Sequence, residues 1–361
     1  MNRNRYEATR RTALAGAAGA LSAAMAGFGG RRAFAGEELN ALVWCDHTDP
    51  ALLAPFEEST GAKVNVKDYE GTGTALSLVE QSQPGDWDVF VVDSVDVPRV
   101  AEMGLLAELP DDAFPWGDIF PELRQPDLHY RDGKLYAVPE KFGYNAIAYN
   151  RDRVDPADMR RAEMMWNDKY AGRYAIYDYY IPTMELVGLG LGVKPAELTA
   201  DKLGPIRDKL LRMKTLAAVV GDVVTVQNAL VTGAADIIIS GGEYAVSGLM
   251  TENPALDWVI PDEGGIRWGQ AIGVFAASTK RDLATQFVQY IVGAQGQGLL
   301  ATSSCYWAMP SNRTAALDAG QKLTLRWDEQ PGFLANSHNY FIPDAALDQA
   351  MLDVWTEFLQ A

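Results

Sequence analysis

The sequence has 361 residues, 48% of them hydrophobic, and a formal net charge of −17 at pH 7. The first 35 residues contain six arginines and one glutamate, which leaves 25 basic and 47 acidic residues in the rest, a net charge near −22. This balance argues against nucleic-acid or anionic-membrane partners, which require a basic surface, and the remaining chain is long enough for two domains.

The N-terminal segment has the features of an export signal. Arg10 and Arg11 precede a weakly apolar run, and residues 33–35 form an A-x-A end. We therefore expect residues 1–35 to be a twin-arginine signal, cleaved after Ala35, with a Sec signal as the alternative. The run 13–28 is too short and too rich in Gly and Ala for a membrane helix, and no cysteine directly follows the cleavage site. The sequence thus predicts a free periplasmic protein.

The next elements alternate between strand and helix, at lengths typical of a parallel sheet flanked by helices. Strands are expected at 38–44, 62–70 and 86–94, and helices at 50–60, 74–83 and 97–103. Ligands bind beyond the carboxyl ends of the strands in such sheets. The residues expected to matter are Trp44, Cys45, Asp46 and His47 after the first strand, and Asp93, Ser94 and Asp96 after the third.

Residues 133–153 are expected to leave this first lobe. A short strand at 136–139, a polar and aromatic crossing at 141–145 and a strand at 146–149 are interpreted as a hinge strand at the floor of a cleft. Tyr144 lies in the crossing. The first lobe is predicted to comprise residues 37–143 and 270–320.

A second alternation of strands and helices follows the hinge. Strands are expected at 173–178, 236–240 and 257–260, and helices at 182–191, 199–214, 227–232 and 244–250. Residues 144–269 are predicted to form the second lobe. A return strand at 271–277 and a helix at 280–292 lead back to the first lobe, and residues 321–361 form a C-terminal segment whose last helix packs on the lobes.

Four stretches resemble bacterial ABC-transporter solute-binding proteins, in particular the spermidine/putrescine receptor family. They are the opening Trp44–Val64, the hinge pattern Tyr136–Asp152, the crossover Pro261–Trp268 with its Gly-Gly turn, and the late turn Tyr306–Asn312. The resemblance spans nearly the whole chain after the signal. It implies a two-lobed α/β periplasmic binding protein of type II, in which each lobe is a mostly parallel sheet flanked by helices and two crossing hinge strands join the lobes.

The resemblance also implies ligand-facing positions. Trp44, Ser94, Trp268 and one aromatic residue of the late turn, Tyr306 or Trp307, stand where the family contacts its ligand. His47 and Asp96 replace tyrosines of the family, Gln270 replaces an aspartate, and residues 178–182 lack the family's acidic pair. Asp46, Asp96 and Glu243 are candidate replacements for the missing carboxylates. Core packing is the alternative for Trp268.

The predicted ligand is a polyamine or a related organic cation. A lining of aromatic and amide groups also suits a monoamine or quaternary amine, a zwitterion or a polyol. Adjacent tyrosines resemble ferric-iron receptors, although neighbouring side chains usually diverge. No cofactor or metal is expected. The predicted ligand-binding residues are Trp44, Asp46, His47, Ser94, Asp96, Tyr144, Tyr179, Tyr180, Glu243, Tyr244, Trp268, Gln270 and Tyr306.

The expected role is capture of the solute by a monomer that delivers it to membrane permease subunits, with a sensor subunit as the alternative. Catalysis is not expected, because Cys45, Asp46 and His47 are sequence neighbours that point apart and no G-x-S-x-G or H-E-x-x-H motif occurs. An oxidising compartment permits a disulfide between Cys45 and Cys305, but spacing alone cannot show that the Cα atoms are close enough, and two separate buried thiols are the default expectation.

Overall fold

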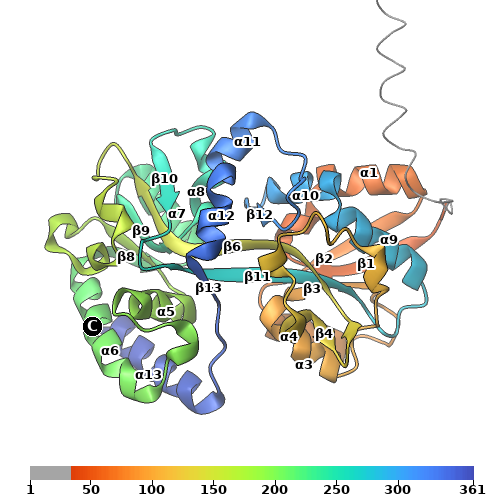
Figure 1. Cartoon of the computed structure of the whole chain (residues 1–361), viewed down its shortest axis with the longest axis horizontal. Helices are drawn as coiled ribbons and strands as arrows, with labels where there is room; N and C mark the ends of the chain where they lie inside the picture. Colours follow the sequence, from red (N-terminus) through yellow and green to blue (C-terminus); the bar gives the residue numbers. More distant parts are fainter. Residues whose placement is uncertain (1–33) are drawn as a thin grey trace, which may run out of the picture.

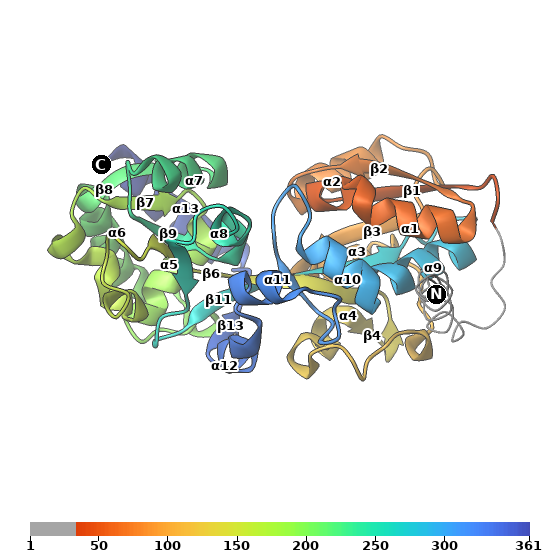
Figure 2. The ribbon, with the colours of Figure 1, turned by 90° about the horizontal axis from the view of Figure 1, so that it is seen from above.

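The computed structural model describes residues 34–361, which form two lobes side by side (Figures 1 and 2). The predicted export signal lies outside the described residues except for Phe34 and Ala35. Within the described part, no helix is both long and apolar enough to cross a membrane.

The first lobe is built on three parallel strands, of which β1 and β3 are largely buried and β2 is mostly half-buried or exposed. Its sheet has the order β2-β1-β3, because both β2 and β3 pair in parallel with β1. Helix α1 begins where Asp49 caps the Ala51 N–H and ends at Gly61, whose φ of 77° favours glycine. The elements are β1 (Glu38–Val43), α1 (Pro50–Thr60), β2 (Lys63–Asp68), α2 (Thr72–Glu80), β3 (Val89–Asp93), α3 (Val97–Glu102), α4 (Pro126–His129), β4 (Tyr130–Arg131), β5 (Lys134–Leu135), α9 (Arg281–Val292), α10 (Ala294–Ala301) and β12 (Met309–Pro310).

The second lobe repeats this arrangement. Strand β7 pairs in parallel with β8 on one side and β9 on the other. The C-terminal helix α13 packs against α5 and α6, and Trp355 donates its indole N–H to Asp178 at 2.8 Å. The elements are β7 (Tyr174–Tyr177), α5 (Tyr180–Gly190), α6 (Leu203–Leu216), β8 (Ala217–Gly221), α7 (Val223–Thr232), β9 (Ile237–Gly241), α8 (Glu243–Met250), β10 (Leu256–Val259), α11 (Ala319–Thr324), α12 (Gln330–Ala335), β13 (Ser337–Asn339) and α13 (Ala345–Gln360).

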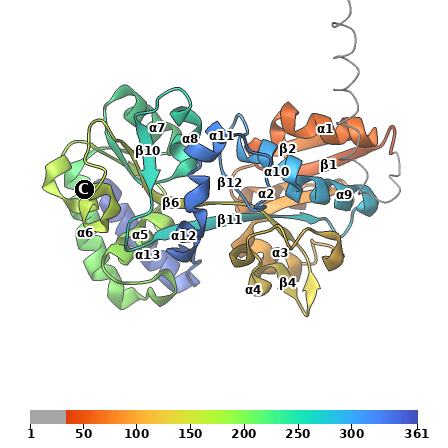
Figure 3. The same cartoon turned by 45° about the horizontal axis from the view of Figure 1, so that its top comes forward.

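Two long strands connect the lobes, β6 (Val138–Asn150) and β11 (Gly265–Val274), as Figure 3 shows. They pair with each other in antiparallel fashion, while β3 pairs with β11 and β9 with β6, so that the sheet order is β2-β1-β3-β11-β6-β9-β7-β8. The predicted two-lobed α/β fold with two crossing strands is confirmed. The predicted lobe boundaries at positions 143 and 270 fall inside these strands.

The hinge differs from its prediction in one respect. Residues 138–150 form one uninterrupted strand instead of two short strands around a polar crossing. The polar residues in its middle, Glu140, Lys141 and Asn145, are buried and have hydrogen-bond partners. Because each of these side chains makes at least one hydrogen bond inside the protein, the strand continues through them.

Helix α5 places the carboxyl group of Glu185 in the core of the second lobe. Its side chain is 1% exposed; Oε1 accepts the Phe341 N–H at 3.2 Å, and Oε2 has no partner among the described residues. Burial raises the pKa of Glu185 from 4.5 to about 9. Glu185 therefore stays protonated at neutral pH in the folded protein but ionises in the unfolded chain.

We expect Glu185→Gln to stabilise the protein at pH 7. The pKa of Glu185 is higher in the folded state, so the contribution of Glu185 to stability is fully present below about pH 4.5 and is lost as pH rises toward 9. The Glu185→Gln variant does not lose this contribution as pH rises. Its unfolding free energy should therefore exceed that of the natural protein by about 3 kcal/mol at pH 7. Urea unfolding of both proteins at pH 5 and pH 8 measures how this difference changes with pH. Parallel curves for both proteins at the two pH values would show that Glu185 ionises equally in both states.

Candidate ligand-binding site

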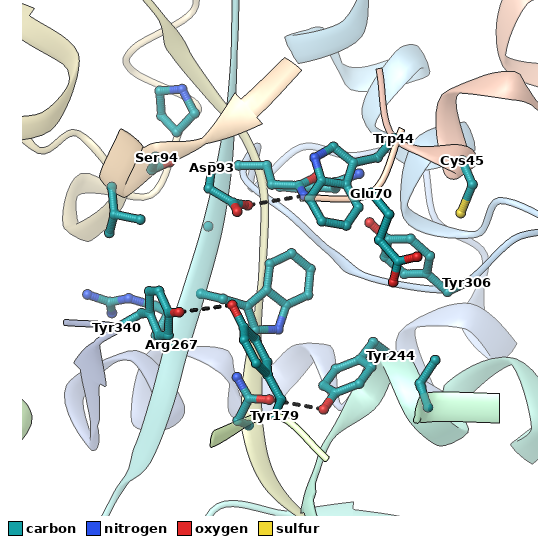
Figure 4. A pocket seen from close by; sticks show the side chains of 18 of the residues that line it. Trp44, Cys45, Glu70, Asp93, Ser94, Tyr179, Tyr244, Arg267, Tyr306 and Tyr340 are labelled. Atoms are coloured by element: carbon teal, nitrogen blue, oxygen red, sulfur yellow. Dashed lines mark hydrogen bonds between the residues drawn. The ribbon is translucent and has the colours of Figure 1, made fainter. Parts of the chain in front are cut away.

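A cavity of about 490 Å³ lies between the lobes, against β6 and β11 (Figure 4). The first lobe contributes residues at or just after the ends of β1, β2 and β3, and the second contributes residues at the end of β7 and from α7 and α8, which follow β8 and β9. These are the carboxyl ends of parallel strands, where this type of sheet binds ligands. The volume is in the range of small-molecule sites.

Aromatic rings line both sides of the cavity. Figure 4 shows Trp44 across the cavity from Tyr179 and Tyr244. Trp44 packs on Tyr69 with ring centroids 5.7 Å apart, and Tyr244 packs edge-on against Trp268 at 6.2 Å. The hydroxyls of Tyr179 and Tyr340 lie 2.9 Å apart. Ring faces and edges therefore form much of the wall.

A carboxylate and an amide meet on the first-lobe side of the cavity, where Asp93 at the end of β3 pairs with Gln270 of β11. Gln270 Nε2 donates to Asp93 Oδ1 at 3.3 Å, and Gln270 Oε1 is buried without a hydrogen-bond partner among residues 34–361. Burial, reinforced by the negative charge of Asp96, raises the pKa of Asp93 to about 6. Asp93 and Gln270 both line the cavity, and the amide oxygen is the acceptor of the pair that still lacks a donor among the described residues.

Seven predicted site residues line the cavity. They are Trp44, Ser94, Tyr179, Tyr244, Trp268, Gln270 and Tyr306. Trp268 thus lies on the cavity wall, which contrasts with the alternative of core packing. Six predicted residues are absent from the wall: Asp46, His47, Asp96, Tyr144, Tyr180 and Glu243.

Asp46 and His47 belong to a buried group of four charged side chains. The chain turns after β1 into a short 3-10 helix, Cys45–Thr48, which directs both side chains into the first lobe. His47 contacts Asp46 at 3.0 Å and Glu140 at 2.9 Å, and Lys141 forms ion pairs with Asp46 and Glu140. Burial alone would lower the pKa of His47, but Glu140 and Asp46 raise it to about 9.

The same four-residue group holds the pKa of Asp46 well below its usual value, because Lys141 and His47 outweigh the effect of burial. We name Asp46, His47, Glu140 and Lys141 the buried tetrad. The two acids of the tetrad already pair with its two bases. Asp46 therefore does not supply the ligand-binding carboxylate for which the sequence made it a candidate.

Strand geometry explains the places of Tyr144 and Glu243. Successive side chains of β6 point to opposite faces, so Asn145 lines the cavity while Tyr144 enters the core and donates to Gln330 at 2.8 Å. Glu243, at the start of α8, accepts the Tyr144 N–H at 3.1 Å. This carboxyl group therefore supports the backbone of the hinge strand.

The two adjacent tyrosines diverge. Tyr179 lines the cavity, whereas Tyr180 donates its hydroxyl to Asp348 of α13 at 2.5 Å. Asp96 ends a short 3-10 helix and acts on the cavity through the pKa of Asp93. No group of three or more His, Cys, Asp or Glu side chains within residues 34–361 is arranged to hold a metal ion.

Several lining residues were not among the predicted site residues. Asp93 is the last residue of β3 and Tyr69 directly follows β2. The carboxyl-end rule pointed to Asp93, which was not carried into the predicted ligand-binding residues, and the same rule could have selected Tyr69. Arg267 precedes Trp268 within the crossover motif. Tyr340 had no local signal, because its position depends on the path of the C-terminal segment beside β11.

Cys45 and Cys305 form a disulfide with Cα atoms 6.0 Å apart, which decides between the two alternatives left open by the sequence. It joins the segment after β1 to the turn that carries Tyr306, and both cysteines line the cavity. Two hydrogen bonds reinforce the junction, from Ser303 Oγ to the Asp46 carbonyl and from the Ser304 N–H to Asp49. The wall around Tyr306 is thus fixed covalently to the wall around Trp44.

A cavity between two α/β lobes that share two crossing strands defines a solute-binding protein. Residues 51–331 match the model of the bacterial extracellular solute-binding protein family, and the chain belongs to that family. The predicted family resemblance is confirmed. Several proteins with similar sequences or structures carry names of solute-binding proteins.

The spermidine/putrescine-binding periplasmic protein 1 of Haemophilus influenzae is 22% identical over 317 residues, covering 85% of this chain and 84% of that protein. The spermidine/putrescine-binding periplasmic protein of Escherichia coli K12 is 23% identical over 252 residues, covering 69% and 71%. The structure of the spermidine/putrescine ABC transporter substrate-binding protein PotD from Streptococcus pneumoniae has a TM-score of 0.77 at 18% identity, covering 90% and 99%.

These relatives are solute-binding proteins rather than enzymes. The chain is accordingly a solute-binding receptor of the type that serves ABC importers, and the prediction that it is not an enzyme is confirmed.

Proposed function

We propose that the protein captures a small organic cation, a polyamine or a related amine, in the periplasm and delivers it to an ABC permease. The observation that carries the proposal is the Asp93–Gln270 pair. A buried amide oxygen without a partner, next to a carboxylate, requires a donor, and an ammonium group supplies both donors and positive charge.

The aromatic wall supports the same ligand class. Rings such as Trp44, Trp268 and Tyr306 attract a cation through their faces and cover the apolar part of an amine. Asp68, the last residue of β2, and Glu70, just after it, add two more carboxylates to the lining. Together these groups give the cavity a lining that suits positive charge on the first-lobe side.

The proposed mechanism follows from the position of the cavity between the lobes. A ligand that contacts both lobes stabilises the closed arrangement by its differential affinity, and the closed monomer then docks on the permease. The N-terminal signal, cleaved after Ala35, would deliver the chain to the periplasm. The names of the relatives, which refer to spermidine and putrescine, support this proposal by similarity at low identity.

Calorimetric titration with matched compounds tests the proposal. We expect spermidine, 1,4-diaminobutane or n-butylamine to bind, and 1-butanol, which lacks the charge, to bind at least about thirtyfold more weakly, because a charge-assisted hydrogen bond in a desolvated site contributes about 2 kcal/mol or more. Binding of the alcohol and the amines with equal affinity, or of no amine in the panel, would contradict the proposed ligand class.

A further inference from the structure

We propose that the amine bound by this cavity carries a single ammonium group and, at its other end, a neutral hydrogen-bond donor such as a hydroxyl, which donates to the amide oxygen of Asn145. The inference rests on the proposed function and makes it more specific. It follows from the distribution of acids over the cavity wall, from the hydrogen bonds of two amide side chains on the second-lobe side, and from the register of β6 with β11.

The acidic side chains on the described cavity wall all come from the first lobe. They are Asp68, Glu70 and Asp93, at or just after the ends of β2 and β3. The second lobe contributes aromatic, aliphatic and amide side chains to the wall. An ammonium group therefore meets carboxylates at one end of the cavity, whereas at the other end it would lose water without gaining an opposite charge.

Three acids adjoin the second-lobe wall in sequence but do not line it: Asp178, Asp222 and Glu243. Asp178 accepts the Trp355 indole N–H, and Asp222 accepts the Thr225 N–H at the start of α7. Burial raises the pKa of Glu243 to about 8, so this group is mostly neutral at pH 7. The first turns of α7 and α8, where helices carry partial positive charge, lie at the same wall. This side of the cavity therefore does not favour a second ammonium group.

The Tyr244 hydroxyl sets the orientation of the Asn145 amide. Its oxygen lies 2.6 Å from the carbonyl oxygen of the buried Ser240 and 3.0 Å from Asn145 Oδ1, the contact drawn as a dashed line at Tyr244 in Figure 4. Burial raises the pKa of Tyr244 well above 10, so the hydroxyl keeps its one proton and donates to one of the two oxygens. The shorter distance assigns that proton to Ser240. A half-turn of the Asn145 amide, which preserves its shape, then lets its NH2 group donate to the Tyr244 oxygen.

In this orientation the oxygen of Asn145 is free for the ligand. Asn145 lines the cavity, and the end of its amide away from Tyr244 lies open to the cavity without a hydrogen-bond partner within residues 34–361. Gln227 of α7 also lines the cavity, and its Nε2 donates to the Ala245 carbonyl at 2.9 Å. Both amides thus direct their NH2 groups to the first turn of α8 and keep their oxygens as neutral acceptors, which suit a neutral donor.

The two ends of the inferred ligand lie on one face of the hinge strands. Gln270 stands opposite Lys141 in the antiparallel pair of β11 and β6, and side chains directly opposite each other share a face. Asn145 is four positions from Lys141 along β6, an even number, and therefore lies on that face too. These four positions span about 13 Å. An ammonium group near Gln270 thus needs a chain of several methylenes to bring the far end to Asn145, and Trp268, opposite Gly143, lies beside that chain.

The experiment compares three ligands at each chain length from about four to ten carbons: the α,ω-diamine, the ω-amino alcohol, and the n-alkylamine in which a methyl replaces the hydroxyl. Calorimetric titrations at pH 7 are run on the natural protein, on Asn145→Asp, and on Asn228→Asp, which adds the same charge at an exposed position of α7 outside the cavity lining.

At the best chain length, we expect the amino alcohol to bind the natural protein and the control about two- to tenfold more tightly than the alkylamine, the range for one hydrogen bond. It should bind at least about tenfold more tightly than the diamine, whose second charge lacks a partner. Asn145→Asp supplies that partner and should shift the ratio by about ten- to a hundredfold in favour of the diamine.

A second variant, Asn145→Leu, removes the acceptor and should abolish the advantage of the amino alcohol over the alkylamine. Each ratio compares ligands on the same protein, so it separates recognition from folding. The inference would be overturned, and the amine receptor left intact, by a diamine that binds the natural protein at least as tightly as the amino alcohol, by an amino alcohol with no advantage over the alkylamine, or by ratios unchanged in the Asn145 variants. Failure of all amines would refute the proposed function itself.

Discussion

Replacing Asp93 by asparagine should weaken amine binding by at least about thirtyfold, the largest effect on binding that we expect from a single substitution. Removing one partner of a desolvated charge pair costs about 2–5 kcal/mol, most of it from the charge left unpaired. Asparagine has the same size and can still accept the Gln270 N–H at the present 3.3 Å contact, so the fold should persist. Calorimetric titration with the tightest amine of the panel measures the change.

Asp68→Asn is the matched control for this experiment, because Asp68 also lines the cavity but is largely exposed and follows β2. Its effect should be small, as exposed ion pairs contribute about 1 kcal/mol or less. If Asp68→Asn removed binding while Asp93→Asn did not, the ammonium would lie at the β2 end of the cavity.

The same carboxylate should make binding pH-dependent. The pKa of Asp93 is raised to about 6 by burial and by Asp96, and an ammonium ligand binds the ionised form. The affinity should therefore fall as pH decreases through 6, by about tenfold between pH 7 and pH 5. Asp93→Asn should show no such fall between these pH values.

The sequence was sufficient to predict the two lobes and the strands that join them. Alternating elements indicated parallel sheets, and the expected hinge segment around Tyr144 and the expected return strand at 271–277 lie in or overlap the observed β6 and β11. The rule that ligands meet the carboxyl ends of strands selected Trp44 and Ser94, and both line the cavity. Local pattern and fold class were enough for these residues.

Side-chain directions after a strand could not be predicted in the same way. Asp46 and His47 follow Trp44 directly, but a 3-10 turn directs them into the first lobe. Asn145 lines the cavity, whereas its neighbour Tyr144 on β6 enters the core. Predicting which of the two faces the cavity therefore required the register of the strand. Tyr340 reaches the cavity only because β13 pairs with β11, a contact between distant parts of the chain.

Replacing Lys141 by methionine should destabilise the protein by about 3–5 kcal/mol, the largest loss of stability that we expect. All four side chains of the buried tetrad are fully buried. Removing the lysine leaves Asp46 and Glu140 with His47 as their only base in the tetrad, and a buried charge without compensation is strongly unfavourable. Methionine fills a similar volume, so the loss reports charge more than packing. Urea unfolding at pH 7 measures it.

A double-mutant cycle distinguishes a lost ion pair from a lost contact. Asp46→Leu combined with Lys141→Met removes one acid and one base, and the double variant should recover a large part of the stability lost by Lys141→Met alone. Additive losses would mean that the two charges do not interact in the folded protein. The tetrad joins the segment after β1, which carries Trp44, to hinge strand β6, and Lys141 also lies 5.2 Å from the ring of Tyr306. The ion pairs that stabilise the first lobe thus also hold two aromatic walls of the cavity against the strand on which the lobes are joined.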